Sequence, residues 1–225
     1  MQYSLIERND DFVVINKAPG VTVQRDDGQH GLLEKVASDL GLEKLFPVHR
    51  LDKPTSGVLL MACRPESNQV LSGLFQAREV EKYYLALSFN KPKKKQGSIK
   101  GDMEKARRGS WKLTTTQKNP AVTQFFSQSL APGVRSYLLK PHTGKTHQLR
   151  VAMRSLGAPI LGDKRYGGED SDRTYLHAWQ LSFPWNGETK RFKALPEQGE
   201  YFLNPAFFTS IEPWGKPELL EWPKI

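Results

Sequence analysis

Residues 49–62 read HRLDKPTSGVLLMA, a turn with a single acid that leads directly into an apolar run. The run 58–62 is short and aliphatic, which predicts a buried strand. Before it, His49, Arg50 and Lys53 surround the carboxylate of Asp52. A nearby arginine favours the ionised form of such an acid, and an ionised carboxylate can act as a nucleophile or base. The alternative is an aspartate that only caps a turn, which is common.

Short apolar runs and helical patterns interleave along the rest of the chain. Further strands are predicted at 12–17, 82–89, 121–130, 134–140 and 173–183, and helices at 31–42, 68–75 and 146–156. Several strand pairs have connections too short for parallel crossovers. We therefore expect one α+β domain over residues 1–225, with a mainly antiparallel mixed sheet flanked by helices.

The ends of two segments are also predicted. Thr146 is expected to cap the helix at 146–156, and Gly157 to stop it. From Glu200 onwards the chain is dense in proline and aromatic residues. We expect this C-terminal tail, residues 200–225, to pack over the core as irregular structure.

Positive charge is concentrated in one segment. The chain has a formal net charge of +9, and residues 91–112 hold nine Lys or Arg against two acids, a net +7. Clustered cations bind polyphosphates through counterion release, so nucleic acid is the first partner to consider. The alternative is a solvated, mobile loop that only aids solubility.

Several classes of function are disfavoured. No apolar run approaches the roughly 20 residues that cross a bilayer, the N-terminus lacks a signal-peptide pattern, and one cysteine cannot form an internal disulfide. These features predict a cytoplasmic protein without membrane contact, with a monomer as the default. HTGKTH lacks the P-loop glycine, because position 139 is Leu, and the histidines include no close metal-binding pair. We therefore expect neither cofactor nor metal.

Two patterns offer partners for Asp52. On the helix at 146–156, His147, Arg150 and Arg154 share a face with no acid at helical spacing. This face is either solvated or paired with a phosphate or carboxylate from elsewhere in the fold. On the strand at 82–89, Tyr84 alternates with small residues. Its ring either belongs to a second packed layer or stacks on a nucleobase.

Together, four stretches resemble motifs of the RluA family of RNA pseudouridine synthases. They are LIERNDDFVVINKAPGVTV (5–23), HRLDKPTSGVLLMA (49–62), KYYLAL (82–87) and GKTHQLRVAM (144–153) continuing to GAPILGDKRYG (157–167). They occur in the family's order and span Leu5 to Trp185. The resemblance implies the catalytic fold of pseudouridine synthases, with two lobes around a central RNA-binding cleft. The resemblance implies isomerisation of uridine to pseudouridine in structured RNA, ribosomal or transfer, after the base is flipped into a pocket.

The resemblance also implies roles for individual residues. Asp52 would be the catalytic residue, Tyr84 would stack on the flipped uracil, and Arg150 would hold Asp52 ionised. Arg50 would fill the gap left by the flipped base. We further expect RNA contacts from the basic segment and the basic helix face, namely Lys93, Lys94, Lys95, Arg107, Arg108, His147 and Arg154.

Two departures from the family pattern stand out. Ala152 occupies a position where the third motif usually has histidine, and the helical pattern places it on the apolar stripe. We also expect no S4 RNA-binding domain, which some relatives carry, before residue 12, and we expect the basic segment to take over some of that anchoring. Two rivals remain: a non-catalytic RNA-binding or RNA-folding protein, and a metal-dependent nuclease, which would need more carboxylates than the Asp52 loop offers.

Overall fold

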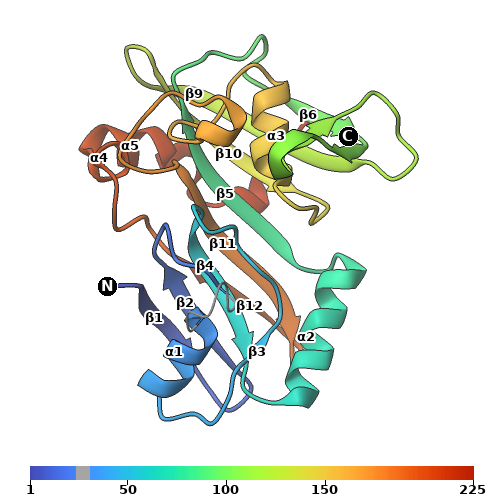
Figure 1. The fold of residues 1–225 in the computed structure, drawn as a ribbon, viewed down its shortest axis with the longest axis vertical. Helices are drawn as coiled ribbons and strands as arrows, with labels where there is room; N and C mark the ends of the chain where they lie inside the picture. The colour runs from blue at the N-terminus through green and yellow to red at the C-terminus, as the bar shows by residue number, and fades with distance from the viewer. Residues whose placement is uncertain (24–30) are drawn as a thin grey trace. The chain divides into compact units, whose positions relative to one another are not determined.

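The computed structural model describes residues 1–23 and 31–225, and its secondary structure is mixed. Strand pairing is mainly antiparallel and helices flank the strands, which confirms the predicted α+β class (Figure 1). The chain divides into two compact units. Unit 1 comprises Met1–Lys82 and Ala178–Pro196, and unit 2 comprises Tyr83–His177 and Glu197–Ile225.

Unit 1 is built around two fully buried strands. Its elements are β1 (Tyr3–Arg8), β2 (Phe12–Lys17), α1 (Leu32–Asp39), β3 (Phe46–Pro47), β4 (Ser56–Ala62), α2 (Pro65–Ala77), most of β11 (Leu176–Trp185), and β12 (Glu188–Lys193). β2 lies between β1 and β4, antiparallel to both, and every residue of β2 and β4 is buried. Strands buried on both faces have continuous apolar runs, which is why FVVINK and VLLMA were recognisable.

The core of unit 1 joins these strands to α2. Leu71 of α2 and Phe183 of β11 belong to one buried cluster with side chains of β2 and β4. Phe12 makes edge-to-face contacts with Phe183, Trp185 and Phe192. This core fixes the start of β4, and therefore the loop that carries Asp52.

Unit 2 has its own set of antiparallel strands. Its elements are most of β5 (Glu81–Ser88), β6 (Gln96–Gly101), β7 (Met103–Lys105), η1 (Arg107–Gly109), β8 (Trp111–Leu113), β9 (Ala121–Ala131), β10 (Val134–Pro141), α3 (Gln148–Ser155), η2 (Lys164–Tyr166), α4 (Glu200–Leu203), α5 (Pro205–Ile211), η3 (Glu212–Trp214) and η4 (Pro217–Leu219). The strand order is β5-β10-β9-β6, and β7 pairs with β8 as a separate hairpin. The predicted strands at 121–130 and 134–140 pair antiparallel.

Two predictions about local structure were wrong. The helix α3 begins at Gln148 rather than after Thr146, because His147 has a left-handed φ of 58°. For the basic segment, the alternative of a mobile loop does not hold over most of its length, because it forms β6 and the β7–β8 hairpin. The tail forms α4 and α5 instead of irregular structure. Asn204 caps α5 by accepting a hydrogen bond from the Ala206 N–H, and Pro205 follows it at the first helical position.

A helix that crosses a bilayer needs about 20 mostly apolar residues. Among residues 1–23 and 31–225, no helix has the combination of length and hydropathy that crossing a membrane requires.

Candidate active site

Backbone hydrogen bonds fix the loop that carries Asp52. The Thr55 N–H donates to the Asp52 carbonyl at 2.9 Å and closes a turn, while the Asp52 residue itself is half-buried. The Gly20 N–H donates to the Lys53 carbonyl at 2.8 Å. At the end of the loop, Gly57 has a φ of +115°, and a Cβ built there would lie 2.2 Å from the Ala178 carbonyl oxygen. Only glycine fits at this position, so the loop enters β4 along one path.

Lys17 joins the turn at 18–20 to the same loop. Its side chain is fully buried, and its ammonium donates to the carbonyls of Ala18 at 2.9 Å, Val21 at 2.8 Å and Lys53 at 3.2 Å. Three carbonyl oxygens replace the water that a buried ammonium loses. The sequence analysis did not identify this role, because FVVINK predicts only a buried strand.

His49 anchors the beginning of the loop as a neutral imidazole. Its Nε2 accepts a hydrogen bond from the Leu60 N–H at 3.0 Å, and its ring stacks on Phe75 at a centroid distance of 4.6 Å. Burial, with a smaller contribution from the positive charge of Lys82, lowers the pKa of His49 to about 3. His49 therefore acts as a structural acceptor, whereas Arg50 and Lys53 are exposed.

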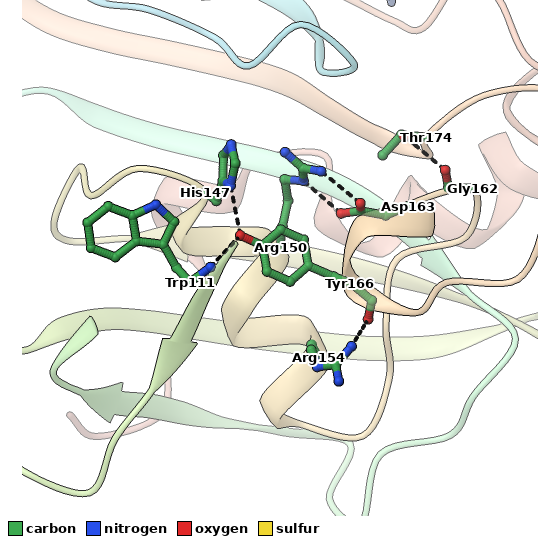
Figure 2. A network of polar contacts seen from close by, with 8 residues as sticks. All are labelled: Trp111, His147, Arg150, Arg154, Gly162, Asp163, Tyr166 and Thr174. Carbon is green, nitrogen blue, oxygen red and sulfur yellow. Dashed lines mark hydrogen bonds and ion pairs between the residues drawn. The ribbon is translucent and has the colours of Figure 1, made fainter. Parts of the chain in front are cut away.

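In unit 2, Arg150 is buried and paired with an acid. Its Nε and Nη2 donate to the two carboxylate oxygens of Asp163, both at 2.7 Å, and the side chains are only 6% and 1% exposed (Figure 2). The guanidinium also lies 4.9 Å from the centroid of the Tyr166 ring. Arg150 is therefore not part of a solvated face, and its described carboxylate partner is Asp163. The pairing with Asp52 that the resemblance implies stays a prediction. The sequence analysis missed Asp163.

Tyr166 forms hydrogen bonds with the other two residues of the predicted basic face, His147 and Arg154. Its hydroxyl is hydrogen-bonded to His147 Nδ1 at 2.7 Å and accepts the Trp111 N–H at 3.1 Å. Arg154 Nη1 donates to the Tyr166 carbonyl at 2.8 Å (Figure 2). His147, Arg150 and Arg154 thus all contact one short segment, Gly162–Gly167.

Gln148 fixes the beginning of α3 against β9. Its Nε2 donates to the Val122 carbonyl and Thr123 Oγ1, and its Oε1 accepts from Thr143 Oγ1 and the Lys145 N–H. This buried amide therefore uses both donors and both acceptor sites. The arrangement aims Arg150, two residues later, and also explains why the helix starts at 148. Ala152 lies on the buried face of α3, as predicted.

Tyr84 is half-buried on β5, opposite Leu139 of β10. Ala86 and Ser88, on the same side of the strand, are fully buried. Beyond Tyr84, this side of β5 is therefore covered, as in a packed layer, while Tyr84 itself is only half-buried.

The predicted RNA-binding cations of the basic segment form two separate groups along the chain. Lys93–Lys95 are exposed and precede the edge strand β6, while Arg107 and Arg108 are exposed at the tip of the β7–β8 hairpin. Arg165 of η2, which the sequence analysis did not identify, donates from Nη1 to the Arg108 carbonyl at 3.0 Å. The tip of the hairpin is thus attached to the segment that also contacts Arg150.

Comparison with known proteins gives a consistent result. The family model described as RNA pseudouridylate synthase matches residues 11–155, which include Asp52, Tyr84 and Arg150. An uncharacterised RNA pseudouridine synthase of Haemophilus influenzae is 50% identical over 214 residues, covering 94% of this chain and 96% of that protein. The dual-specificity RNA pseudouridine synthase RluA of Pasteurella multocida is 34% identical over 204 residues, covering 85% and 92%.

A solved structure agrees with these sequence matches. Human RNA pseudouridylate synthase domain containing 1 superposes with a TM-score of 0.73 at 27% sequence identity. The match covers 85% of this chain and 82% of the human chain. The similarity thus extends over most of both chains.

Proposed function

The chain belongs to the RluA family of RNA pseudouridine synthases, and from this premise we propose that Asp52 is its catalytic residue. The enzyme isomerises uridine to pseudouridine in RNA. The N1–C1′ bond breaks, the uracil rotates, and C5 bonds to C1′. The C5 proton leaves and N1 gains a proton, so the reaction balances without a redox partner or a second substrate.

The observation that carries the assignment is the way in which the Asp52 loop is held. Its carbonyls are fixed by Thr55, Gly20 and Lys17, and its first residue is anchored through His49. A residue that only caps a turn does not need this many supports. A reacting carboxylate does, because a displacement of about 1 Å can cost a hundredfold in rate.

Arg150 and Tyr84 are assigned to the same reaction. The bidentate pair with Asp163 and the Tyr166 ring hold the guanidinium of Arg150 in one orientation, with a positive charge that favours an ionised carboxylate. Tyr84 offers a partly exposed aromatic face for stacking on the flipped uracil. Exposed Arg50 is assigned to the RNA, where it fills the gap that the flipped base leaves.

The substrate is structured RNA, ribosomal or transfer. The Pasteurella relative is described as a dual-specificity enzyme, which supports keeping both classes of RNA as candidate substrates. Lys93–Lys95, Arg107 and Arg108 would contact the phosphate backbone, together with His147 and Arg154. We further propose that the protein is a monomer that acts in the cytoplasm without a cofactor.

The test uses the variant Asp52→Asn and RNA tritiated at C5 of uridine. We expect tritium release to fall by more than about a thousandfold, because the amide is neither a nucleophile nor a base. RNA affinity, measured by filter binding, should stay within about threefold of the wild type. Asp39→Asn is the matched control, because this exposed carboxylate bonds only to Tyr3 and Lys35 among the contacts described.

Two outcomes would contradict the proposal. Near-wild-type turnover of Asp52→Asn would remove this residue from the mechanism. A wild-type protein that binds RNA but releases no tritium from any uridine would favour a non-catalytic RNA-binding role.

A further inference from the structure

Tyr166 is the one side chain that bonds to both α3 and the basic hairpin among the contacts described for η2. Its ring is buried, with 1% exposure, at the end of that short helix. Its hydroxyl accepts the backbone N–H of Trp111, the first residue of β8, at 3.1 Å. The same hydroxyl bonds to His147 Nδ1, at the beginning of α3, at 2.7 Å. One oxygen atom therefore links the hairpin to the helix that carries Arg150.

The chemistry of a phenol suits this position. Burial raises the pKa of Tyr166, so the hydroxyl keeps its proton. A protonated hydroxyl can accept one hydrogen bond and donate another at the same time. It accepts a hydrogen bond from the Trp111 N–H, and it can donate one to Nδ1 of a neutral His147 that carries its proton on Nε2. A phenylalanine would preserve the ring but lose both bonds.

A neighbouring residue supports the hairpin independently. Arg165 Nη1 donates to the Arg108 carbonyl at 3.0 Å, at the tip of the hairpin. Tyr166 therefore holds the first residue of β8, next to the tip, and Arg165 holds the tip itself. The hairpin carries Lys105, Arg107, Arg108 and Lys112, whose positive charges are suited to a phosphate backbone.

We propose that the Tyr166 hydroxyl is a positioning group, which docks the β7–β8 hairpin on α3 so that its cations hold the RNA backbone at a fixed place relative to Arg150. Tyr166 touches no reacting atom. Its ring packs on Arg150, but its hydroxyl acts through the hairpin. The inference rests on the proposed RNA-modifying function for its activity readout, and its structural readout is independent of that function.

The first experiment compares Tyr166→Phe with the wild type by hydrogen exchange and by steady-state kinetics. Exchange of the Trp111 amide should accelerate about tenfold or more, because its acceptor is gone. The KM for structured RNA should rise about three- to tenfold, while kcat stays within about twofold, because the ring still packs on Arg150. Arg165→Gln removes the other attachment and should also raise KM without a change in kcat.

The matched control is Tyr175→Phe. The Tyr175 hydroxyl also accepts a backbone N–H, from Tyr201 at 3.0 Å, and bonds to the Asp172 carboxylate at 2.6 Å. The substitution therefore deletes the same kind of hydrogen bonds in the same unit, but away from the hairpin. It should leave KM, kcat and Trp111 exchange unchanged.

The outcomes separate this inference from the proposed function. A fall in kcat at constant KM and constant Trp111 exchange would mean that Tyr166 acts through Arg150, and would overturn the inference. Faster Trp111 exchange at constant KM would show that hairpin docking does not serve RNA binding, and it would also overturn the inference. If the wild type releases no tritium, filter binding of the same RNA replaces KM, and unchanged affinity of both variants overturns the inference. If Tyr166→Phe does not fold, Arg165→Gln decides.

Discussion

At the scale of single residues, the stretch around Asp52 divides its side chains between support and reaction. His49 and Lys17 turn inward, the first as a hydrogen-bond acceptor for Leu60 and the second as a donor to three carbonyls. Neither residue needs to touch RNA to matter, because both fix the backbone of the loop. Protonation of His49 should therefore destabilise the loop, and the pH dependence of the free energy of unfolding tests this.

We expect acid to destabilise the protein through His49 at a pH where most carboxylates are still ionised. In the unfolded chain this histidine binds a proton near pH 6.5, whereas in the folded chain its pKa is about 3. The unfolded state therefore binds more protons between these values. The contribution of His49 to stability is complete above pH 6.5 and decreases as the pH falls towards 3, with a limiting slope of about 1.4 kcal/mol per pH unit.

The measurement is urea unfolding at pH 7, 6, 5 and 4.5, for the wild type and His49→Gln. Glutamine can keep an acceptor near the Leu60 N–H but cannot be protonated, so the free energy of unfolding should depend less on pH. Identical pH dependence of the two proteins would show that His49 titrates normally in the folded state. Carboxylates such as Asp11, whose pKa a hydrogen bond from Arg64 lowers, lose their contribution only at more acidic pH.

The sequence identifies the candidate reacting residues more readily than the residues that hold them in place. Asp52 and Arg150 lie in stretches that resemble the family's motifs, whereas their local patterns alone also allow a turn cap and a solvated face. Asp163 did not stand out, because it follows Arg150 by thirteen positions in a loop and has no periodic relation to it. Tyr166 was hidden for the same reason. A motif shows which residues occur together, but a hydrogen bond between a helix and a loop depends on their tertiary placement.

At the scale of secondary-structure elements, the C-terminal tail departs most from expectation. Its aromatic residues are spaced too irregularly for a helical stripe over ten or more positions, and α4 and α5 are short. The Asn204–Pro205 start signal was readable but carries little weight alone. In the structure α5 packs on β9 and β10, and Ser210 and Ser136 share a hydrogen bond of 2.7 Å (Figure 1). Tertiary packing, not local pattern, makes this segment helical.

Phe207 tests whether the tail is part of the core of unit 2. Its side chain is fully buried and packs against Phe202, so Phe207→Ala should lower the free energy of unfolding by about 3–5 kcal/mol. The neighbouring Phe208 is 37% exposed, and Phe208→Ala serves as the control with a much smaller loss. Urea unfolding gives both values. A small and equal loss for both variants would mean that the tail packs only loosely.

At the scale of the whole molecule, the uneven charge distribution is the feature most relevant to RNA. The segment 91–112 carries a net +7 of the total +9, and much of it forms β6 and the β7–β8 hairpin. Lys93, Lys94 and Lys95 are exposed before an edge strand, and Arg107 and Arg108 are exposed on a docked hairpin tip. Cations on a docked hairpin lose less entropy on binding than cations on a mobile loop, and all five are exposed, so these charges should contribute measurably to RNA affinity.

The salt dependence of RNA binding measures that contribution. Each phosphate contact contributes roughly 0.7–0.9 to the slope of log affinity against log salt concentration. Converting Lys93, Lys94, Lys95, Arg107 and Arg108 to Gln should therefore reduce the slope by up to about 4, if all five contact phosphates. The affinity loss should be large at low salt and small at high salt, because fewer counterions are released on binding.

A charge-matched control is needed, because any loss of five positive charges weakens attraction to RNA over long range. The control converts five other lysines to Gln: Lys35, Lys44, Lys190, Lys216 and Lys224. It has the same net charge, but we expect its slope to change by less than about 1, because long-range attraction is screened and releases few ions. Equal slopes for the two variants would mean that RNA responds to total charge alone, and that the basic segment has no contact role of its own.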